Sequence, residues 1–347
     1  MMAPTPTLER LPTVIQAPMA GAQNHRLAAA VCEAGGLGSL PAAMLSLDEL
    51  HQQLQALQQA TQRPYNVNFF CHTPPTPNAP AQAAWQSTLA PYYQAMGVER
   101  ASGGAARVPF SHAAADVLQA FRPAVVSFHF GLPAPDLLAR VKGWGAWVLS
   151  SATTVAEALW LQAQGADVII AQGLEAGGHR GMFLSEDLNT QMGTFALLPQ
   201  IVQAVRLPVI AAGGIATPSG VVAAQALGAA AVQMGSAYLC SHEASTSALH
   251  RAALQSSAAQ HTALTNLFTG RPARGIVNRV MRELGPMHPA APAFPLATAD
   301  MAPLRAAAEA QGSSDFTPLW AGQNAASCRS AAAADITRDF LQAWRVA

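Results

Sequence analysis

The chain has 347 residues, of which 51% are hydrophobic and 11% are charged. This length suits one large domain, or a large domain with a small partner. The 19 basic and 19 acidic residues leave a formal net charge of zero, so the sequence shows no electrostatic footprint for nucleic acid or for an anionic membrane surface. No stretch approaches the ~18 uninterrupted apolar residues typical of a membrane span.

The N-terminus and the cysteines both favour a cytoplasmic location. Glu9 and Arg10 lie close to the first short apolar run, which is unlike a signal peptide. The cysteines are far apart in the chain and form no CxxC pair, so we interpret them as small buried side chains in a reducing compartment and expect no metal site. They are Cys32, Cys71, Cys240 and Cys328.

Eight short apolar runs recur between residue 13 and about residue 236, each followed by a glycine-rich or polar joint. Each run has about four to six residues and is almost continuously apolar, as expected for strands that are buried on both faces. The runs are Thr13–Ala17, Leu37–Leu40, Tyr65–Phe69, Ala124–Phe128, Ala146–Leu149, Asp167–Ala171, Pro208–Ala212 and Ala230–Met234.

Amphipathic helical patterns lie between these runs, for example at Arg26–Ala34, Leu47–Ala60, Thr154–Gln164 and Ser219–Leu227. Alternating strands and helices indicate a parallel sheet, and eight such units close naturally into a barrel. The sequence therefore predicts an α/β protein with a (β/α)8 TIM barrel. A doubly wound open sheet is the alternative that the alternation leaves open.

Two segments interrupt the alternation. Residues 71–112 form a proline-rich excursion with a helical patch after the third strand. Residues 240–317 follow the eighth strand and are mostly helical in pattern, whereas a last helix at about 330–345 is expected to return to the barrel. We therefore predict a barrel made of residues 1–239 and 318–347, with a small, mainly helical lid or substrate subdomain inserted at 240–317.

Small residues, amides and histidines follow the predicted strands, and the active site of such a barrel forms at the carboxyl ends of its strands. Carboxylates are scarce there, apart from Glu175. The candidate site residues are Ala17, Pro18, Met19 and Ala20 after the first strand, Asn68 on the third, His129 at the end of the fourth, Gln172, Gly177, Gly178 and His179 after the sixth, Gly213 and Gly214 after the seventh, and Gln233, Met234, Gly235 and Ser236 at the eighth.

The glycines after strands seven and eight predict a site for the phosphate of a bound cofactor. Loops at these two strands are the usual phosphate site of the barrel, and their backbone N–H groups converge on the anion. Gly213-Gly214 and Gly235-Ser236 occur at these places, and glycine lets the backbone approach a ligand closely. Either pair alone is equally consistent with a tight turn.

Asn68 and Gln172 are neutral amides on barrel strands. An amide both donates to and accepts from a heteroaromatic edge such as the isoalloxazine ring of a flavin. The alternative is a polar layer inside the barrel whose hydrogen bonds are satisfied by the protein. The residues themselves leave both interpretations open.

His179 is the candidate catalytic residue, because it lies in the glycine-rich sequence AGGHRG at the predicted barrel mouth. A histidine there can hydrogen-bond an anionic oxygen or act as a base near neutral pH. His129 and Ala20 are weaker candidates for the substrate pocket. Arg271, Arg274 and Arg279 form the most basic run, which belongs either to the surface of the subdomain or to a lid that closes over the site.

Several enzyme classes are disfavoured by absent motifs. No GxGxxG follows the first strand, which argues against a dinucleotide-binding Rossmann domain. There is no GxSxG nucleophile elbow. No cysteine lies between Cys71 and Cys240, so a cysteine nucleophile after the sixth strand is excluded.

Six segments in order, QAPMAG, YNVNFF, VVSFHFG, DVIIAQGLEAGGHRG, PVIAAGGI and AVQMGSAYL, resemble the bacterial nitronate monooxygenases, formerly called 2-nitropropane dioxygenases. The resemblance covers residues 12–239, resumes at FTGRPARGIVN and is weak at LWAGQNA (319–325). It implies a non-covalent FMN in a barrel with a lid-like second domain. It places FMN contacts at Asn68, Gln172, Gly177, Gly214 and Gln233–Ser236, and the catalytic histidine at His179.

The resemblance also implies an activity in nitroalkane detoxification. Alkyl nitronates such as propionate-3-nitronate would be oxidised with O2 to carbonyl compounds and nitrite through a flavosemiquinone. FMN-dependent enoyl-acyl-carrier-protein reductases resemble the chain at EAGGH as well, and their acidic partner would need a basic docking patch, for which only the arginines at 271–282 are candidates. An NAD(P)H:quinone reductase and a flavin-binding protein without turnover also remain open. The oligomeric state and the preferred nitronate are not predicted.

Overall fold

The computed structural model describes residues 11–100 and 107–346, so Glu9 and Arg10 lie outside the described residues. All eight predicted apolar runs form strands, which lie parallel in one sheet in the order β1-β9-β8-β6-β5-β4-β3-β2. Ile15 forms a further parallel bridge with Leu37, which brings the two ends of this order together. The sheet therefore closes into the predicted TIM barrel, and the open-sheet alternative is excluded.

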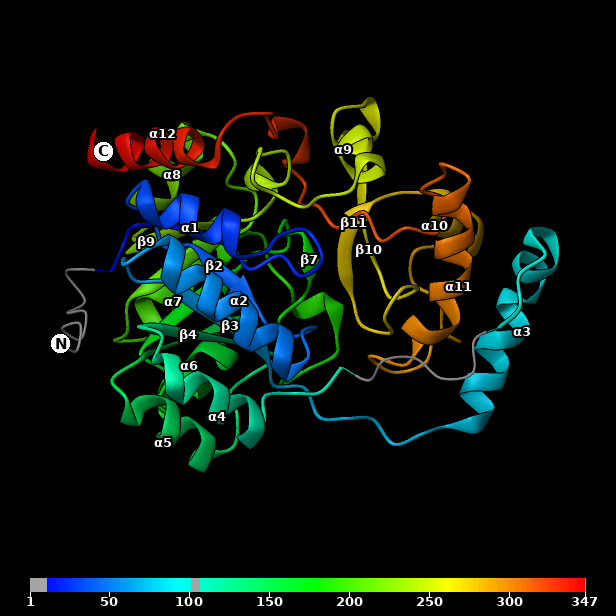
Figure 1. Ribbon diagram of the computed structural model, residues 1–347, viewed down its shortest axis with the longest axis horizontal. Coiled ribbons are helices and arrows are strands. Elements are labelled where there is room, and N and C mark those ends of the chain that lie inside the picture. The colour runs from blue at the N-terminus through cyan, green and yellow to red at the C-terminus, as the bar shows by residue number, and fades with distance from the viewer. Residues whose placement is uncertain (1–10, 101–106, 347) are drawn as a thin grey trace.

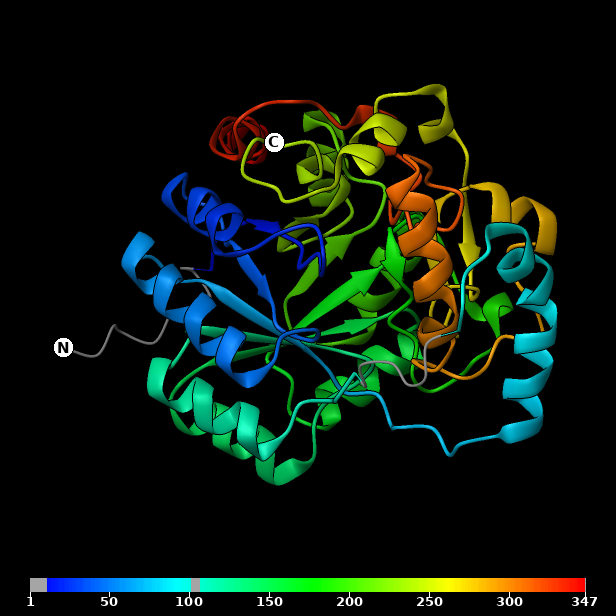
Figure 2. The same cartoon turned by 45° about the vertical axis from the view of Figure 1, so that its right-hand side comes forward.

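The barrel strands and helices alternate as predicted, and the helices surround the sheet (Figures 1 and 2). The last helix packs against α8 and α1, as expected for the eighth helix of the barrel. The strands are β1 (Val14–Gln16), β2 (Ser39–Pro41), β3 (Asn66–Phe70), β4 (Val125–His129), β5 (Trp147–Ala152), β6 (Val168–Gln172), β8 (Val209–Ala212) and β9 (Ala231–Met234). The helices are α1 (His25–Glu33), α2 (Leu47–Ala60), α4 (His112–Phe121), α5 (Pro135–Gly143), α6 (Val155–Ala163), α7 (Thr194–Ala204), α8 (Pro218–Ala226) and α12 (Ala333–Val346).

Local sequence signals explain where these helices begin. Ser46 caps α2 in a capping box with Glu49, so each side chain satisfies a backbone N–H that the helix leaves free. Thr154 and Thr217 cap α6 and α8 in the same region of the barrel, with a proline in the first turn of α8. The helices are therefore held at defined positions, and the loops at the carboxyl ends of the strands have fixed starting points.

The segment after β9 forms a subdomain beside the barrel mouth (Figure 1). Besides helices it contains a pair of strands that the helical pattern did not predict, because each strand has only four residues. Strand β11 pairs with β7, a two-residue strand from the loop after β6, so the sheet joins the subdomain to that loop. The elements are β7 (Gly178–His179), α9 (Ala248–Leu254), β10 (Thr262–Thr265), β11 (Ala273–Ile276), α10 (Arg279–Leu284) and α11 (Ala297–Ala310).

Helix α3 (Ala79–Met96), in the excursion after β3, packs against α11 and not against the barrel (Figures 1 and 2). Trp85 and Leu89 of α3 are fully buried and share one apolar cluster with Leu304 of α11. The Tyr93 hydroxyl donates to the Asp300 backbone carbonyl at 2.5 Å. The subdomain is thus built from two separate parts of the chain. No helix within residues 11–100 and 107–346 is long and apolar enough to cross a membrane.

Candidate active site

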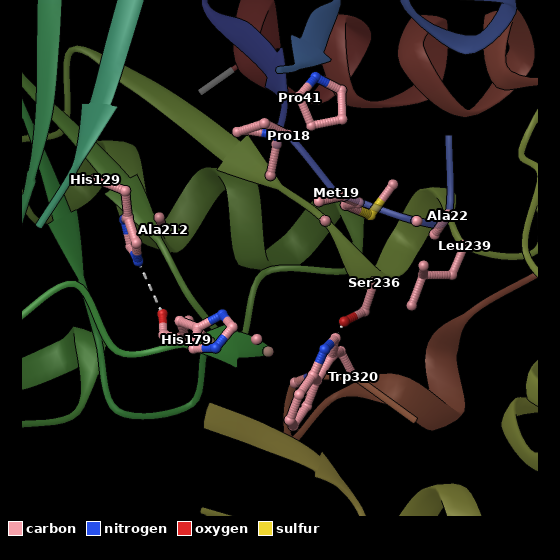
Figure 3. A pocket seen from close by; sticks show the side chains of 18 of the residues that line it. Pro18, Met19, Ala22, Pro41, His129, His179, Ala212, Ser236, Leu239 and Trp320 are labelled. Carbon is pink, nitrogen blue, oxygen red and sulfur yellow. Dashed lines mark hydrogen bonds between the residues drawn. The ribbon is translucent and has the colours of Figure 1, made fainter. Parts of the chain in front are cut away.

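A cavity of about 290 Å³ lies at the carboxyl ends of the barrel strands, between the barrel and the subdomain (Figure 3). The structure brings every candidate residue of the sequence analysis to its wall. These are Ala17, Pro18, Met19, Ala20, Asn68, His129, Gln172, Gly177, Gly178, His179, Gly213, Gly214, Gln233, Met234, Gly235 and Ser236. Glu175 is not among the lining residues, because its carboxylate turns away and accepts from the Thr194 backbone N–H at the start of α7.

One end of the cavity, which we call the glycine end, is made by Gly213, Gly214, Gly235 and Ser236. Gly213 and Gly214 have φ angles of +112° and +73°, which favour glycine. Within the described part of the chain, the backbone N–H groups of Gly213, Gly214 and Gly235 donate no hydrogen bond to the protein. These groups are therefore available to an anionic ligand.

A third segment completes the glycine end. The backbone N–H of Gly322 donates to the Ser236 hydroxyl oxygen at 2.9 Å, so the Ser236 hydroxyl proton can be donated to a ligand. The Asn324 side chain donates to the Gly214 carbonyl at 3.0 Å. Gly177 packs so closely here that a Cβ atom would lie 2.5 Å from the Gly322 nitrogen. Glycine at 177 is thus required by close backbone approach.

His179 lies at the other end of the cavity, which we call the aromatic end. Its backbone is held in β7, opposite Ala273 of β11, and its backbone carbonyl accepts from the Gln172 amide at 2.9 Å. The His179 Nε2 atom lies 2.9 Å from the Thr269 hydroxyl. With the proton on Nδ1, Thr269 donates to Nε2 and the Nδ1–H group is left for a ligand. The loop histidine is therefore fixed by both the barrel and the subdomain.

The environment favours the neutral form of His179. Burial is the largest cause that lowers its pKa well below 6.5, and the nearby charge of Arg107 adds to it. His129 lies next to the same loop, with its ring Nε2 atom 3.1 Å from the His179 carbonyl oxygen (Figure 3). Burial lowers the pKa of His129 to about 4. Both imidazoles are accordingly uncharged near neutral pH.

The two predicted amides have protein partners and also line the cavity. Asn68 donates to the Ser127 hydroxyl at 2.9 Å, whereas Gln172 accepts from the Gly181 backbone N–H at 2.7 Å. The protein therefore satisfies both ends of the Gln172 amide, whereas the Asn68 Oδ1 atom accepts from none of the described residues. The buried side-chain oxygen of Gln233 likewise has no partner among the described residues.

The three arginines of the basic run do not form one surface patch. Arg271 lies over the Phe130 ring, with its guanidinium 4.0 Å from the ring centre, and donates to the Met182 carbonyl. Arg274 is buried and donates to the Leu174 carbonyl at 2.9 Å. Only Arg279 is exposed, and it pairs with Glu283 at 2.8 Å. Of the arginines at 271–282, the exposed ones are therefore Arg279 and Arg282, whereas Arg271 and Arg274 are held inside the fold.

Sequence reasoning missed several residues of the aromatic end. Phe70 and Trp320 line the cavity beside His179, with ring centres 6.0 and 5.7 Å from that of His179. Phe294 packs against His179 from the subdomain, at 5.3 Å. The weak resemblance at residues 319–325 was the only signal for Trp320. Phe70 lies in the quoted segment YNVNFF but was not singled out, and no local pattern marks Phe294.

Arg107 was also missed, and it lines the cavity from the joint before α4. Its guanidinium lies 5.5 Å from the centre of the Phe294 ring. No carboxylate lines the cavity in the part of the chain that the structure describes. Nor do the described residues place three metal-binding side chains together. The cavity is therefore suited to anionic ligands.

Comparisons with known proteins agree with this geometry. The family model for nitronate monooxygenase matches residues 6–342. A nitronate monooxygenase of Paraburkholderia phytofirmans is 42% identical over 328 residues, which cover 93% of this chain and 89% of the relative. A nitronate monooxygenase of Pseudomonas aeruginosa is 40% identical and 96% of each chain is covered.

Solved structures give the same result. The nitroalkane oxidase of Streptomyces ansochromogenes superposes with a TM-score of 0.90 at 39% identity, over 98% of this chain and 97% of the other. FabK from Thermotoga maritima superposes with a TM-score of 0.72 at 26% identity, over 98% and 94% of the two chains. The chain belongs to the nitronate monooxygenase family and is an oxidoreductase.

Proposed function

We propose that this protein is an FMN-dependent monooxygenase that oxidises alkyl nitronates with O2 to carbonyl compounds and nitrite. Membership of the nitronate monooxygenase family supports the reaction class. The observation that carries the proposal is a neutral histidine, His179, in a cavity to which the described residues contribute no carboxylate. A nitronate is an anion, and such a cavity accepts an anion without like-charge repulsion.

The residues of the cavity fit FMN. The free backbone N–H groups of Gly213, Gly214 and Gly235 would hold its phosphate, together with the Ser236 hydroxyl. The unpartnered oxygen of Gln233 would accept a hydrogen bond from the ribityl chain or the ring. When bound, FMN supplies the electron-accepting chemistry, and the protein supplies orientation and electrostatics.

We assign to His179 the binding of the nitronate group by a hydrogen bond from its ring. A neutral imidazole with a strongly lowered pKa is a weak base, so the removal of a carbon-bound proton from a neutral nitroalkane is disfavoured. We therefore expect preformed nitronates to be much better substrates than the corresponding nitroalkanes. Thr269 would set the orientation of the ring through Nε2.

We assign to Arg107 the recognition of a second negative group on the substrate. Among the described residues its guanidinium pairs with no carboxylate and donates no hydrogen bond, although the residue is half-buried beside the Phe294 ring. Burial lowers the pKa of Arg107, in keeping with a charge that has lost part of its hydration. A carboxylate on the nitronate, as in propionate-3-nitronate, would compensate this charge and exclude water from the aromatic end.

The test is an anaerobic titration of the flavin-loaded protein, followed by its visible absorption. We expect propionate-3-nitronate to change the flavin spectrum rapidly without any nicotinamide, and to release nitrite once air is admitted. NADH and NADPH are expected to leave the spectrum unchanged. Rapid bleaching by a nicotinamide, with the nitronate inert, would contradict the proposal and favour an enoyl-acyl-carrier-protein reductase or a quinone reductase instead.

A further inference from the structure

Two of the four cysteines, 88 residues apart in the chain, lie together in space. The backbone N–H of Cys240 donates to the Cys328 sulfur at 3.2 Å. Both are free thiols. They share one apolar cluster with Leu239 and Ala325, so their approach is fixed by packing.

The pair lies where the chain enters and leaves the subdomain. Cys240 follows the turn at Ser236–Tyr238, through which the chain passes from β9 into the subdomain. Cys328 follows the turn at Ala325–Ser327, through which the chain returns toward α12. Figure 1 shows these outgoing and returning segments, in yellow-green and red, on the same side of the molecule. The two sulfurs therefore lie at the base of the subdomain, where the outgoing and the returning segments of the chain meet.

The chemistry of the pair favours oxidation. The hydrogen bond from the Cys328 thiol is the largest cause that lowers the pKa of Cys240 to about 7, and the charge of Arg251 contributes. A thiolate is the nucleophilic form of cysteine. Cys328 is partly exposed, whereas Cys240 is buried behind it, so a small oxidant reaches the pair from the side of Cys328.

We propose that Cys240 and Cys328 form a reversible thiol–disulfide pair that cross-links the base of the subdomain when a peroxide oxidises it. The partly exposed Cys328 thiol attacks hydrogen peroxide, the O–O bond breaks, and Cys328 sulfenic acid and water form. The Cys240 thiolate then attacks the Cys328 sulfur, and the hydroxide that leaves takes up the proton that Cys240 had released and becomes water. In total two thiols and one peroxide give one disulfide and two waters.

The cross-link has a structural consequence for the glycine end. The returning segment carries Gly322 and Asn324, which bond the Ser236 hydroxyl and the Gly214 carbonyl. A disulfide at Cys328 ties this segment to the outgoing one and closes a loop that contains the subdomain. Closing so long a loop restricts the unfolded chain far more than the folded one. The oxidised protein is therefore the more stable form.

The test uses the flavin-loaded full-length protein, treated with a small excess of hydrogen peroxide and then alkylated after denaturation. We expect peptide mass spectrometry to find Cys240 linked to Cys328, and Cys32 and Cys71 alkylated as internal controls. Burial raises the pKa of Cys32 to about 12, which keeps that thiol unreactive. The melting temperature should rise by about 5 °C on oxidation and fall back with dithiothreitol.

The variants Cys240→Ser and Cys328→Ser provide matched controls. Each variant should have the same melting temperature before and after peroxide treatment, whatever its starting value. Four alkylated thiols after peroxide treatment of the unmodified protein would overturn the proposal. So would a linked pair with an unchanged melting temperature, because the cross-link would then not hold the base of the subdomain. Neither result depends on whether nitronates are substrates.

Discussion

The glycine end and the aromatic end of the cavity are built in different ways. At the glycine end the backbone N–H groups of Gly213, Gly214 and Gly235 have no acceptor among the described residues, and the backbone at Gly177 leaves no room for a side chain. At the aromatic end side chains from the barrel and the subdomain meet, as His179 and Phe294 do. Backbone groups at fixed positions suit a constant group such as a phosphate, whereas side chains can be exchanged to suit a different substrate. Changes at the first end should therefore remove the cofactor, and changes at the second should alter turnover or selectivity.

The largest effect is expected for Gly177→Ala. Its new Cβ atom would lie 2.5 Å from the Gly322 nitrogen and 2.6 Å from the Ala321 carbonyl carbon, and neither backbone atom can move without displacing the glycine end. We expect the purified variant to have lost most of its bound flavin, measured by visible absorption. Gly143→Ala is the control, because no atom lies within 4 Å of its Cβ position. Full flavin content in Gly177→Ala would contradict this account of the glycine end.

The next effect is expected for Arg107→Gln at the aromatic end. It should lower kcat/KM for propionate-3-nitronate by about 30- to 100-fold, because a buried carboxylate would lose a charged partner. For butyl-1-nitronate, which lacks the carboxylate, the fall should be about threefold or less. Flavin content should be unchanged.

Arg305→Gln is the matched control for Arg107→Gln. Arg305 also lines the cavity, but it is paired with Glu309 at 2.7 Å, so its loss should leave the ratio of the two kcat/KM values unchanged. An equal loss of kcat/KM for both nitronates in Arg107→Gln would show that Arg107 does not recognise the carboxylate. The preference for carboxylate-bearing substrates would then need another source.

The aromatic end should also make stability depend on pH. His129 has a pKa of about 4 in the folded protein against an ordinary value of 6.5, so the unfolded chain binds more protons between these pH values. The unfolding free energy should therefore fall as the pH is lowered from about 6.5 toward 4, by up to about tenfold in the unfolding constant per pH unit for this histidine. Urea titrations of the wild type and of His129→Asn at several pH values give the unfolding free energy as a function of pH. The difference between the two slopes is the contribution of His129. Equal slopes would contradict it.

A smaller effect is expected for Thr269→Val. The substitution removes the hydroxyl that lies 2.9 Å from His179 Nε2 but keeps the shape of the side chain. We expect kcat/KM for propionate-3-nitronate to fall about three- to tenfold through loss of one hydrogen bond, with the flavin spectrum unchanged. Thr269→Ser, which keeps the hydroxyl, should restore most of the activity. If Thr269→Ser is as impaired as Thr269→Val, the hydroxyl does not orient the ring.

The two ends also differ in how far the sequence predicts them. The strands and the glycine end were predicted because each depends on neighbours in the chain: apolar runs become buried strands, and Gly213-Gly214 follows one directly. His179 was found for the same reason, since its glycine-rich loop is local. The aromatic end was largely missed, because Arg107 and Phe294 are nearly 190 residues apart and meet only after the subdomain folds.

The subdomain shows the same limit. Its helices were expected, but β11 exists because it pairs with β7 from the loop after β6. Strands this short do not show the alternation of apolar and polar residues by which a strand is recognised in a sequence. Helix α3 was recognised as helical, yet its packing against α11 depends on Trp85, Leu89 and Leu304 meeting across the fold. Such contacts are set by tertiary structure and leave no local pattern. The roles of the site residues stay predictions.

The most direct test of the central claim is nitrite release by the flavin-loaded His179→Asn variant with propionate-3-nitronate in air. The variant should keep its flavin, since the glycine end is untouched, and should lose about 100-fold or more in turnover because the nitronate loses its hydrogen-bond partner. A variant that kept both its flavin and full nitrite release would contradict the assignment of His179, and with it the account of the aromatic end.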